Sequence, residues 1–555
     1  MRLSIQKSKN HEFLYIVKDF YSKGKRTTKI IDKLGTVSSL MLQLNLSHDE
    51  VISWARQKAK DLTLDETHES NKIILSFSSN SLLPFNDNRA YNCGYLFLQS
   101  LLYQMKISNI FRNVSSRHKC QFNLEAIFTD SVYSRVLHPS SKRSSFEFSK
   151  TLLEPPKYQL EDVYRSLSVF SKESDYILSE LYKNSNFIHK RNVSTLYYDC
   201  TNYYFEIEQE DNFRKYGKGK EHRPNPIVGM GLFMDGDGIP LSYSLYPGNR
   251  NEQLTLKPLE RKIIRDFELS KFIYCSDAGL GSLSNKKFNS MKERAYIITQ
   301  SIKKLKKEDR NLALDFSRFK PLTDELYYQE LPLDGKIQER MIITYSPKYA
   351  AYQKNIRLKQ IQRAENMIKE NGKIKKQRRN LNDPARFIET IINNENGEII
   401  EKNYILNEAK ILEESQYDGF YAITTNLEDD DVTKIIAISE RRWQIEECFR
   451  IMKTDFKARP IYLQLEDRIN AHFLICFTAL LTIRLLSIKL GNKYTVQELL
   501  KTLRNMTLTD TGYGSYIPSY TRTEITDELH ESFGFRTDYE ISTKQNIRNI
   551  IKNTK

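Results

Sequence analysis

The stretch from Arg442 to Lys453 combines charged and apolar side chains at the spacing of an α-helix. Residues three and four apart share one face of a helix, and the apolar ones here are Ile445, Phe449, Met452 and Phe456. The charged ones fall beside that stripe and are Arg442, Glu446, Arg450 and Lys453. A carboxylate among cations, at the edge of a face that must be buried, is unusual on a helix that only meets solvent. These residue types predict a site for metal and phosphate.

A second acid lies in the middle of a segment with strand-like composition, Thr195 to Tyr204. Alternation along this strand places Tyr197, Asp199 and Thr201 on one face and Leu196, Tyr198 and Cys200 on the other. A carboxylate in such a position must be paired, solvated or bound to a ligand. A third acid, Asp277, directly follows another expected strand, Lys271 to Ser276.

The order of the expected elements indicates how these acids meet. The first three strands are Thr195 to Tyr204, Ile227 to Met234 and Ile239 to Tyr246, with a hairpin turn at Asp235 to Gly238. A helical crossover, Gln253 to Phe267, leads to the strand before Asp277, and a fifth strand is expected at Ala295 to Gln300. This order predicts an α/β fold with a ribonuclease-H-like mixed sheet and flanking helices, in which the first and fourth strands are parallel neighbours. Asp199 and Asp277 then lie side by side, and Glu446 is the natural third acid from a later helix.

These motifs resemble those of bacterial insertion-sequence transposases of the DDE class, in the group with a Y-x2-R-x3-E-x6-K (YREK) signature. Asp199, Thr201 and Phe205 match the D-x-T-x-x-x-F motif around the first acid of that family. The segments that match around the second acid and the G-N turn are Asp277-Ala278-Gly279-Leu280 and Pro247-Gly248-Asn249. Arg442, Glu446 and Lys453 match the R, E and K of the signature, whereas Ser439 stands where the signature has tyrosine. The resemblance runs from about Tyr197 to Arg484.

The resemblance implies a DNA transposase that cleaves at the ends of its element and transfers the strands into target DNA by a cut-and-paste route. The implied catalytic and metal-binding residues are Asp199, Asp277 and Glu446. The expected DNA-binding residues are Arg442, Lys453, Arg450, Lys218 and Lys220. The implied partners are inverted-repeat transposon ends, target DNA and a second copy of the chain in a homodimeric synaptic complex. Such an enzyme works in the bacterial cytoplasm at the nucleoid.

Carboxylates suit the metal chemistry that phosphodiester cleavage needs. In-line displacement at phosphorus is served by two Mg²⁺ ions, which prefer oxygen ligands, and Mn²⁺ is an expected substitute. Each acid also has a structural alternative: Asp199 as a paired strand acid, Asp277 as a helix cap, and Glu446 as an i,i+4 partner of Arg442 or Arg450. Two alternative functions stay open. One is a ribonuclease-H-like nuclease without strand transfer, and the other is an inactive DNA-binding repressor derived from a transposase.

Composition favours a polyanionic partner. The 555 residues carry a formal net charge of +15, with a pI near 9.2. The six cysteines are scattered without metal-ligand spacing, which argues against a structural zinc site or a disulfide framework. The most apolar run, Ala471 to Ile488, contains Arg484 and is expected to be a buried helix, not a membrane span. The N-terminus has no apolar signal segment, so no export is expected.

Six regions are expected along the chain. They are a basic N-terminal α+β region with possible DNA binding (1–115), a helical region (116–190), the first part of the catalytic domain (191–300), an inserted strand-rich and helical domain (301–432), the second part of the catalytic domain with the signature helix (433–490), and a C-terminal region (491–555). Lys354 to Arg379 is a basic stretch, and a solvated helix face accounts for it as well as a DNA contact does. A strand at Phe420 to Thr425 is expected to return the chain to the catalytic core.

Overall fold

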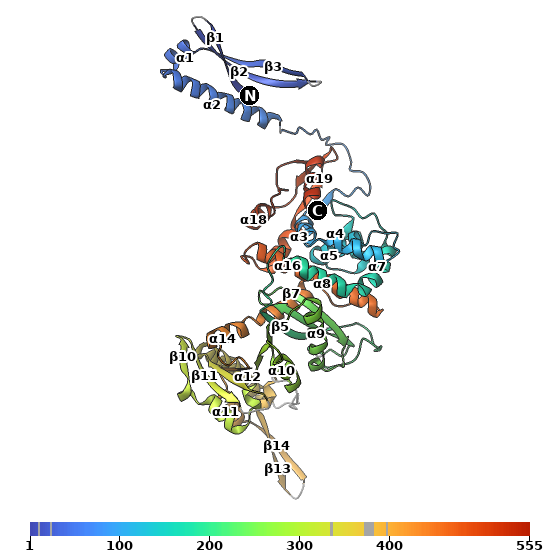
Figure 1. Cartoon of the computed structure of the whole chain (residues 1–555). Helices are drawn as coiled ribbons and strands as arrows, with labels where there is room; N and C mark the ends of the chain where they lie inside the picture. Colours follow the sequence, from blue (N-terminus) through green and yellow to red (C-terminus); the bar gives the residue numbers. More distant parts are fainter. Residues whose placement is uncertain are drawn as a thin grey trace. The chain divides into compact units, whose positions relative to one another are not determined.

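A computed structural model of the chain is drawn in Figure 1. It describes residues 1–8, 11–22, 25–70, 72–221, 223–333, 337–370, 382–395 and 398–555. Residues 371–379 of the basic stretch lie outside the described residues. The chain forms two compact units, Met1–Asp87 and Asn88–Lys555. The first unit therefore ends before residue 115, the boundary expected from sequence.

The first unit is a small sheet covered by helices. Its three strands, in the antiparallel order β1-β2-β3, are β1 (Arg2–Ser8), β2 (His11–Ser22) and β3 (Lys25–Thr36). Its helices are α1 (Val37–Leu44) and α2 (His48–Ser70). Leu14 of β2 packs with Val37, Leu40 and Val51 in a core that is separate from the rest of the protein.

A nine-stranded mixed sheet forms the centre of the second unit. Its order is β10-β11-β12-β15-β9-β8-β5-β6-β7. The strands expected from sequence are β5 (Thr195–Tyr204), β6 (Ile227–Asp235), β7 (Pro240–Pro247), β8 (Ile273–Ser276), β9 (Ala295–Thr299) and β15 (Phe420–Thr425). β5 pairs antiparallel with β6 and parallel with β8, as β8 does with β9. The mixed α/β, ribonuclease-H-like fold expected from the strand order is therefore confirmed.

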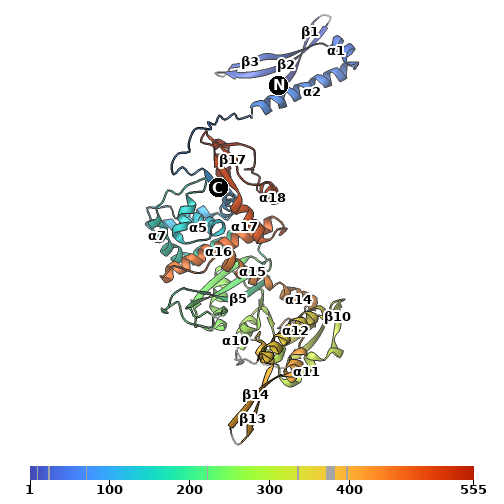
Figure 2. The ribbon, with the colours of Figure 1, turned by 180° about the vertical axis from the view of Figure 1, so that it is seen from behind.

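The two faces of β5 lie in two different hydrophobic cores. Leu196, Tyr198 and Cys200 pack with the crossover helix α9 (Leu256–Asp266), and helix α10 (Leu283–Asn289) lies nearby. Tyr197 and Tyr203 face the opposite core, which contains α14 (Val432–Glu440) and α15 (Trp443–Arg450). Figure 2 shows α15 beside β5. The alternation predicted from sequence is confirmed, and it places Asp199 on the side of the signature helix.

The apolar helix α16 (Glu466–Lys489) fills the space between this sheet and a helical layer. Its neighbours there include α5 (Leu124–Leu137), α7 (Leu160–Lys172) and strand β7. It is the one described helix long and apolar enough to cross a membrane, yet 89% of its apolar window is buried inside the protein. The remaining helices of the layer are α3 (Tyr95–Gln104), α4 (Ile107–Arg117), α6 (Lys142–Ser149) and α8 (Ser174–Ser185).

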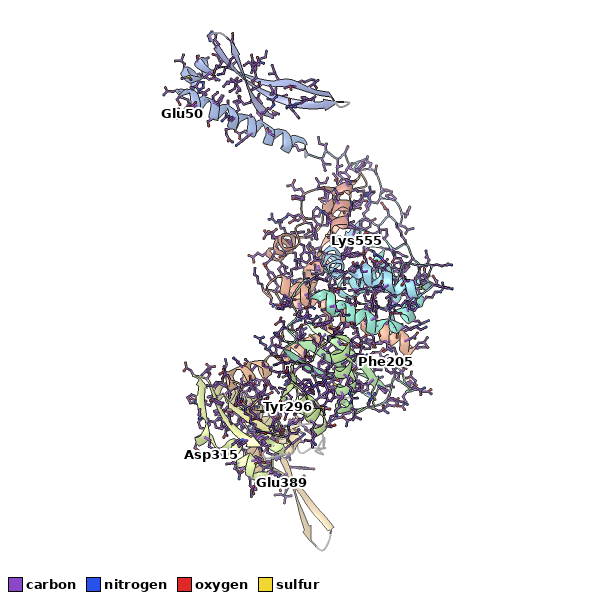
Figure 3. All side chains as sticks on the ribbon, in the orientation of Figure 1. Glu50, Phe205, Tyr296, Asp315, Glu389 and Lys555 are labelled. Carbon is purple, nitrogen blue, oxygen red and sulfur yellow. The ribbon has the colours of Figure 1, made fainter. Side chains whose placement is uncertain are left out.

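Part of the inserted region lengthens the catalytic sheet. Strands β10 (Lys320–Thr323), β11 (Leu326–Leu333) and β12 (Glu339–Tyr345) join it through β15. Tyr296 of β9, labelled in Figure 3, donates to Glu339 Oε2 of β12 at 2.7 Å. A separate hairpin, β13 (Ile388–Glu395) with β14 (Glu398–Leu406), projects from this region in Figure 1. The helices of the insertion are α11 (Lys307–Leu314), α12 (Pro347–Lys369) and α13 (Glu408–Ser415).

The C-terminal residues return to the start of the second unit. Strand β16 (Thr507–Asp510) pairs with β4 (Ala90–Asn92) in a four-stranded sheet completed by β17 (Ser515–Pro518) and β18 (Ser542–Thr543). Lys555, labelled in Figure 3, pairs with Glu154 at 2.7 Å. The helices here are α17 (Val496–Asn505), α18 (Glu524–Phe533) and α19 (Lys544–Asn553). This region is thus part of the folded core.

Candidate active site

Asp199 and Asp277 occupy equivalent positions on neighbouring strands. In the parallel pair β5–β8, Tyr198 is in register with Ser276. Asp199 is the next residue of β5 and Asp277 directly follows β8, so this pairing places the two acids side by side. The electrostatic influence of Asp277 on the Asp199 carboxyl agrees with this placement.

Burial makes the ionised form of the Asp199 carboxyl unfavourable. Burial raises its pKa to about 6, the nearby charge of Asp277 acts in the same direction, and Lys220 and Arg442 oppose the change. Its Oδ1 accepts a hydrogen bond from the backbone N–H of Cys200 at 2.7 Å. Two neighbouring carboxylates that receive few hydrogen bonds from the protein repel each other, and a bound cation would stabilise their charged forms.

Asp277 is also the cap of a short helical turn. Its Oδ1 accepts from the backbone N–H of Gly279 at 2.8 Å, at the start of the 3₁₀ turn Ala278–Leu280. The Gln253 side chain donates to Gly279 O at 3.0 Å and fixes this loop. A Cβ at residue 279 would lie 3.1 Å from Asp277 Oδ1, which is tighter than an ordinary contact. Gly279 therefore leaves room for the Asp277 carboxylate. Asp277 does cap the helical turn, as its structural alternative predicted, and a capping carboxylate can still bind a metal ion.

Two tyrosines of β5 show which part of the signature segment lies opposite Asp199. Tyr197 donates to the carbonyl of Ile438 at 2.9 Å, and Tyr203 Oη lies 3.8 Å from Met452 Sδ. Asp199 lies between these tyrosines on the same face of β5. The chain between residues 438 and 452, which includes α15, therefore crosses the sheet at the level of Asp199.

Glu446 is largely exposed, and its ion-pair partner is Arg442 instead of either aspartate. Its side chain is 61% exposed, and its Oε1 lies 3.6 Å from Arg442 Nη1. Burial alone would lower the pKa of Arg442, but neighbouring negative groups, among them Glu446 and Asp199, raise it overall. Arg442 thus interacts with both Glu446 and Asp199. In this structure Glu446 is the i,i+4 ion-pair partner of Arg442, as its structural alternative predicted. Among the described residues, no group of three or more His, Cys, Asp or Glu side chains is arranged to hold a metal ion.

The signature segment changes its helical form after Arg450. Ile451–Asp455 is a π-helix, closed by a hydrogen bond from Phe456 N to Ile451 O at 2.9 Å. Arg450 forms an ion pair with Asp455 at 3.0 Å, so it does not form one charged group with Lys453. The four apolar residues of the predicted stripe are nevertheless all buried: Ile445, Phe449, Met452 and Phe456. The predicted buried face is therefore confirmed. The predicted charged face is interrupted at the π-helix, which separates Arg450 from Lys453.

Lys453, in the π-helix, lies close enough to Asp199 for the two charges to interact. Burial, together with the charge of Lys220, lowers its pKa to about 8, and Asp199 acts in the opposite direction. Its Nζ is 5.4 Å from the centre of the Tyr203 ring. Lys453 and Arg442 thus bracket Asp199, which is the position that phosphate-binding cations would need.

Glu221 is a member of this site that the sequence pattern did not reveal. Its Oε1 lies 3.8 Å from Lys453 Nζ and also pairs with Arg459. It lies between the two cations and offsets their mutual repulsion. The residues that pair with Glu221 lie far from it in the sequence. Its position directly after Lys220 was therefore the one sequence feature that could have indicated a place in this site.

The basic loop containing Lys218 and Lys220 lies beside the Asp277 turn. Both lysines line a cavity of about 550 Å³ that also includes Gly248 and Gly279. Lys220 Nζ donates to the carbonyl of Cys200, the residue after Asp199. The G-N turn expected from sequence packs closely here, since a Cβ on Gly217 would collide with Gly248 O. Both lysines are exposed residues of this loop, and Lys220 is the one whose charge acts on Asp199.

A comparison with protein-family models agrees with the motifs. The family model described as "Transposase DDE domain" matches residues 198–482, slightly more than half of the 555 residues. Among solved structures, the chain is similar to a piggyBac transposase synaptic complex with hairpin DNA, at 10% identity over 83% of this chain and 84% of that one, with a TM-score of 0.35. A Mos1 transposase paired-end complex with the left transposon end shows 11% identity over 45% of this chain and 72% of that one, with a TM-score of 0.13. A comparison with curated proteins found no match.

Proposed function

The chain belongs to the transposase DDE domain family, and from this premise we propose that it is a cut-and-paste DNA transposase of the YREK group of bacterial insertion sequences. It would cleave DNA at the ends of its own element and join those ends to target DNA. The observation that carries the proposal is the placement of Asp199 beside Asp277, with Arg442 and Lys453 acting on Asp199 from the signature segment.

The donor set fits a pair of divalent cations of the Mg²⁺ type, with Mn²⁺ as a substitute. Asp199, Asp277 and Glu446 offer carboxylate oxygens, which hard cations prefer. The mutual repulsion of Asp199 and Asp277 would be relieved by a cation. Glu446 would complete the set by turning away from Arg442, to which only a weak surface ion pair holds it. When bound, the ions would supply stabilisation of the charge on the attacking and leaving oxygens.

The protein's own groups would hold the DNA for two displacements at phosphorus. In the first, water forms a bond to phosphorus, the bond to the 3′ oxygen breaks, and that oxygen leaves as a 3′ hydroxyl. In the second, this hydroxyl oxygen attacks a phosphorus of target DNA, and a new 3′ hydroxyl leaves. Arg442 would hold a phosphate as a fork and Lys453 as a point charge. Lys218, Lys220 and Arg450 would contact the flanking backbone, with Arg450 first leaving Asp455.

The expected partners follow from the reaction and the charge. A formal net charge of +15 favours DNA, and the binding should weaken steeply with salt because bound phosphates release counterions. Pairing of two transposon ends requires two active sites, so a homodimer would form the synaptic complex, at the nucleoid of a bacterial cell.

Cleavage of end-bearing DNA tests the proposal. The substrate would be DNA that flanks the gene and contains short inverted repeats, incubated with the full chain and Mg²⁺. We expect nicking at the repeat ends, followed by joining to a labelled target. Asp199→Asn should lower the rate by about 100-fold to 1,000-fold, the range for removing one group that stabilises transition-state charge, while still binding DNA.

Two results would favour the alternatives. Cleavage without any joined product would indicate a nuclease. Binding without cleavage by both the native chain and Asp199→Asn would indicate an inactive repressor, for which Ser439 in place of the signature tyrosine is the motivating observation. Ser439 is buried and lines a cavity of about 540 Å³ together with Arg442, Glu446 and Tyr421.

A further inference from the structure

A second basic cavity lies between the helical layer and the segment that follows the signature π-helix. It measures about 620 Å³ and is lined by residues of α5, α6, α16 and the segment 457–465. Five of its lining residues are cations: Arg135, Lys142, Lys457, Arg459 and Arg468. Within the described part of the chain, no acidic residue lines it. We infer that this cavity binds a phosphate group.

Lys142 is the first observation that points to an anion. Its residue is only 6% exposed, it lines the cavity, and among the described residues it has no hydrogen-bond or ion-pair partner. A buried ammonium group without a partner is costly, and proteins ordinarily pair such a group. An anionic ligand in the cavity would supply this partner.

Two arginines add unused donors in the same cavity. The Nε groups of Arg135 and Arg468 are buried without a hydrogen-bond partner. The rest of the Arg135 guanidinium donates to the carbonyls of Phe456 at 3.0 Å and Ser140 at 3.1 Å. Backbone carbonyls fix this group in place but do not neutralise it, so its charge is available to an anion.

The charges around Lys142 repel one another in the unliganded protein. Burial and the nearby Arg135 lower the pKa of Lys142 to about 7, while the Cys476 thiol acts weakly in the opposite direction. Burial, together with Arg135 and Lys142, also keeps the pKa of His472 well below its usual value, so this imidazole is neutral. A bound anion would reverse the effect on Lys142 and cause proton uptake.

The size and setting of the cavity favour a phosphate of a nucleic-acid strand. A volume of about 620 Å³ exceeds that of a simple ion, and Tyr164 and Tyr462 add aromatic surface. Arg459 of this cavity shares Glu221 with Lys453 of the candidate active site. A strand held at Lys453 would therefore pass close to it. Only this assignment to DNA rests on the proposed function; the phosphate site itself does not.

Thermal unfolding of the full chain with inorganic phosphate, in EDTA, tests the site. We expect phosphate to raise the melting temperature of the native chain by about 2 °C or more. Lys142→Met should melt no lower than the native chain without phosphate, because it removes an unpaired buried charge, and should lose the phosphate response. Lys286→Met is the matched control. Lys286 is 8% exposed but pairs with Glu339 at 2.6 Å, so this variant should melt lower and keep the response.

Two further measurements locate the phosphate response at Lys142. Lys453→Met should keep the response, because the response does not arise at the candidate active site. Calorimetry at pH 8 in buffers of different ionisation enthalpy should show proton uptake on phosphate binding by the native chain and none by Lys142→Met. An unchanged melting temperature with phosphate, or an equal response in Lys142→Met, would overturn the inference.

A single-stranded oligonucleotide separates the two sources of phosphate. If the ligand is DNA, Lys142→Met should reduce the slope of log affinity against log salt by about 0.7, the value for one single-strand phosphate contact. An unchanged slope together with a Lys142-dependent phosphate response would assign the site to a free phosphorylated ligand. Because Asp199→Asn is not expected to change either result, loss of DNA cleavage and loss of this site are distinguishable.

Discussion

Arg442 Nη1 lies 3.6 Å from Glu446 Oε1, and the charge of the same guanidinium influences the Asp199 carboxyl of β5. Arg442 is therefore the link between the exposed acid of the signature helix and the partly buried acid of β5. Release of Glu446 from Arg442 would cost little, because an exposed ion pair of this kind contributes about 0.3–0.5 kcal/mol.

Glu446→Gln should lower Mg²⁺-dependent cleavage by about 100-fold or more without a change in stability. Glu447→Gln is its matched control on the next residue. Glu447 pairs with the largely buried Arg484 at 3.2 Å, so its loss should lower stability by about 1–3 kcal/mol and spare cleavage. Both effects would be measured by end cleavage and by chemical unfolding. Full activity of Glu446→Gln would remove this residue from the mechanism.

Metal binding should depend on pH through Asp199. Its pKa is raised from 3.8 to about 6, mainly by burial, so below pH 6 a proton competes with the cation. The Mg²⁺ affinity should rise between pH 5 and 7 and then level off. A raised pKa also means that Asp199 stabilises the fold at low pH and that this stability is lost as the pH rises through about 6. Without metal, Asp199→Asn should therefore melt higher than the native chain at pH 7 but not at pH 4.

The DNA affinity should fall as the pH rises above about 8. Burial lowers the pKa of Lys453 to this value, so its positive charge is lost earlier than that of an ordinary lysine. Lys453→Arg keeps the charge at all these pH values and should remove most of the decrease between pH 7 and 9. Fluorescence anisotropy at constant ionic strength measures it. An identical decrease in both proteins would show that Lys453 does not contact phosphate.

The strand order and the positions of the two aspartates were predictable because they depend on local patterns. Alternation of Tyr and Thr fixed the faces of β5, and its bounds and those of β15 agree with the expectation. Asp199 and Asp277 then meet through the parallel pairing alone. Their roles in binding metal, and those of the basic residues around them, stay predictions.

Other features depend on contacts that a sequence pattern does not contain. The π-helix after Arg450 leaves the apolar stripe intact, so periodicity gave no sign that Arg450 and Lys453 would separate. Glu221 meets Lys453 only because the basic loop folds back over β5. Likewise, β10 to β12 have ordinary strand composition, which does not tell which sheet they join.

Stability of the Asp235 turn should depend on a buried ion pair. Arg191 Nε lies 2.5 Å from Asp235 Oδ2, with side chains 1% and 0% exposed, and Asp235 Oδ1 accepts from Ile239 N at 2.9 Å. Arg191→Met would leave the carboxylate buried without its cation and should cost about 3–5 kcal/mol of unfolding free energy. The exposed pair Lys150–Glu147 offers a control, since Lys150→Met should cost less than about 0.5 kcal/mol. If Arg191→Met unfolds at the same denaturant concentration as the native chain, the pair does not hold this turn.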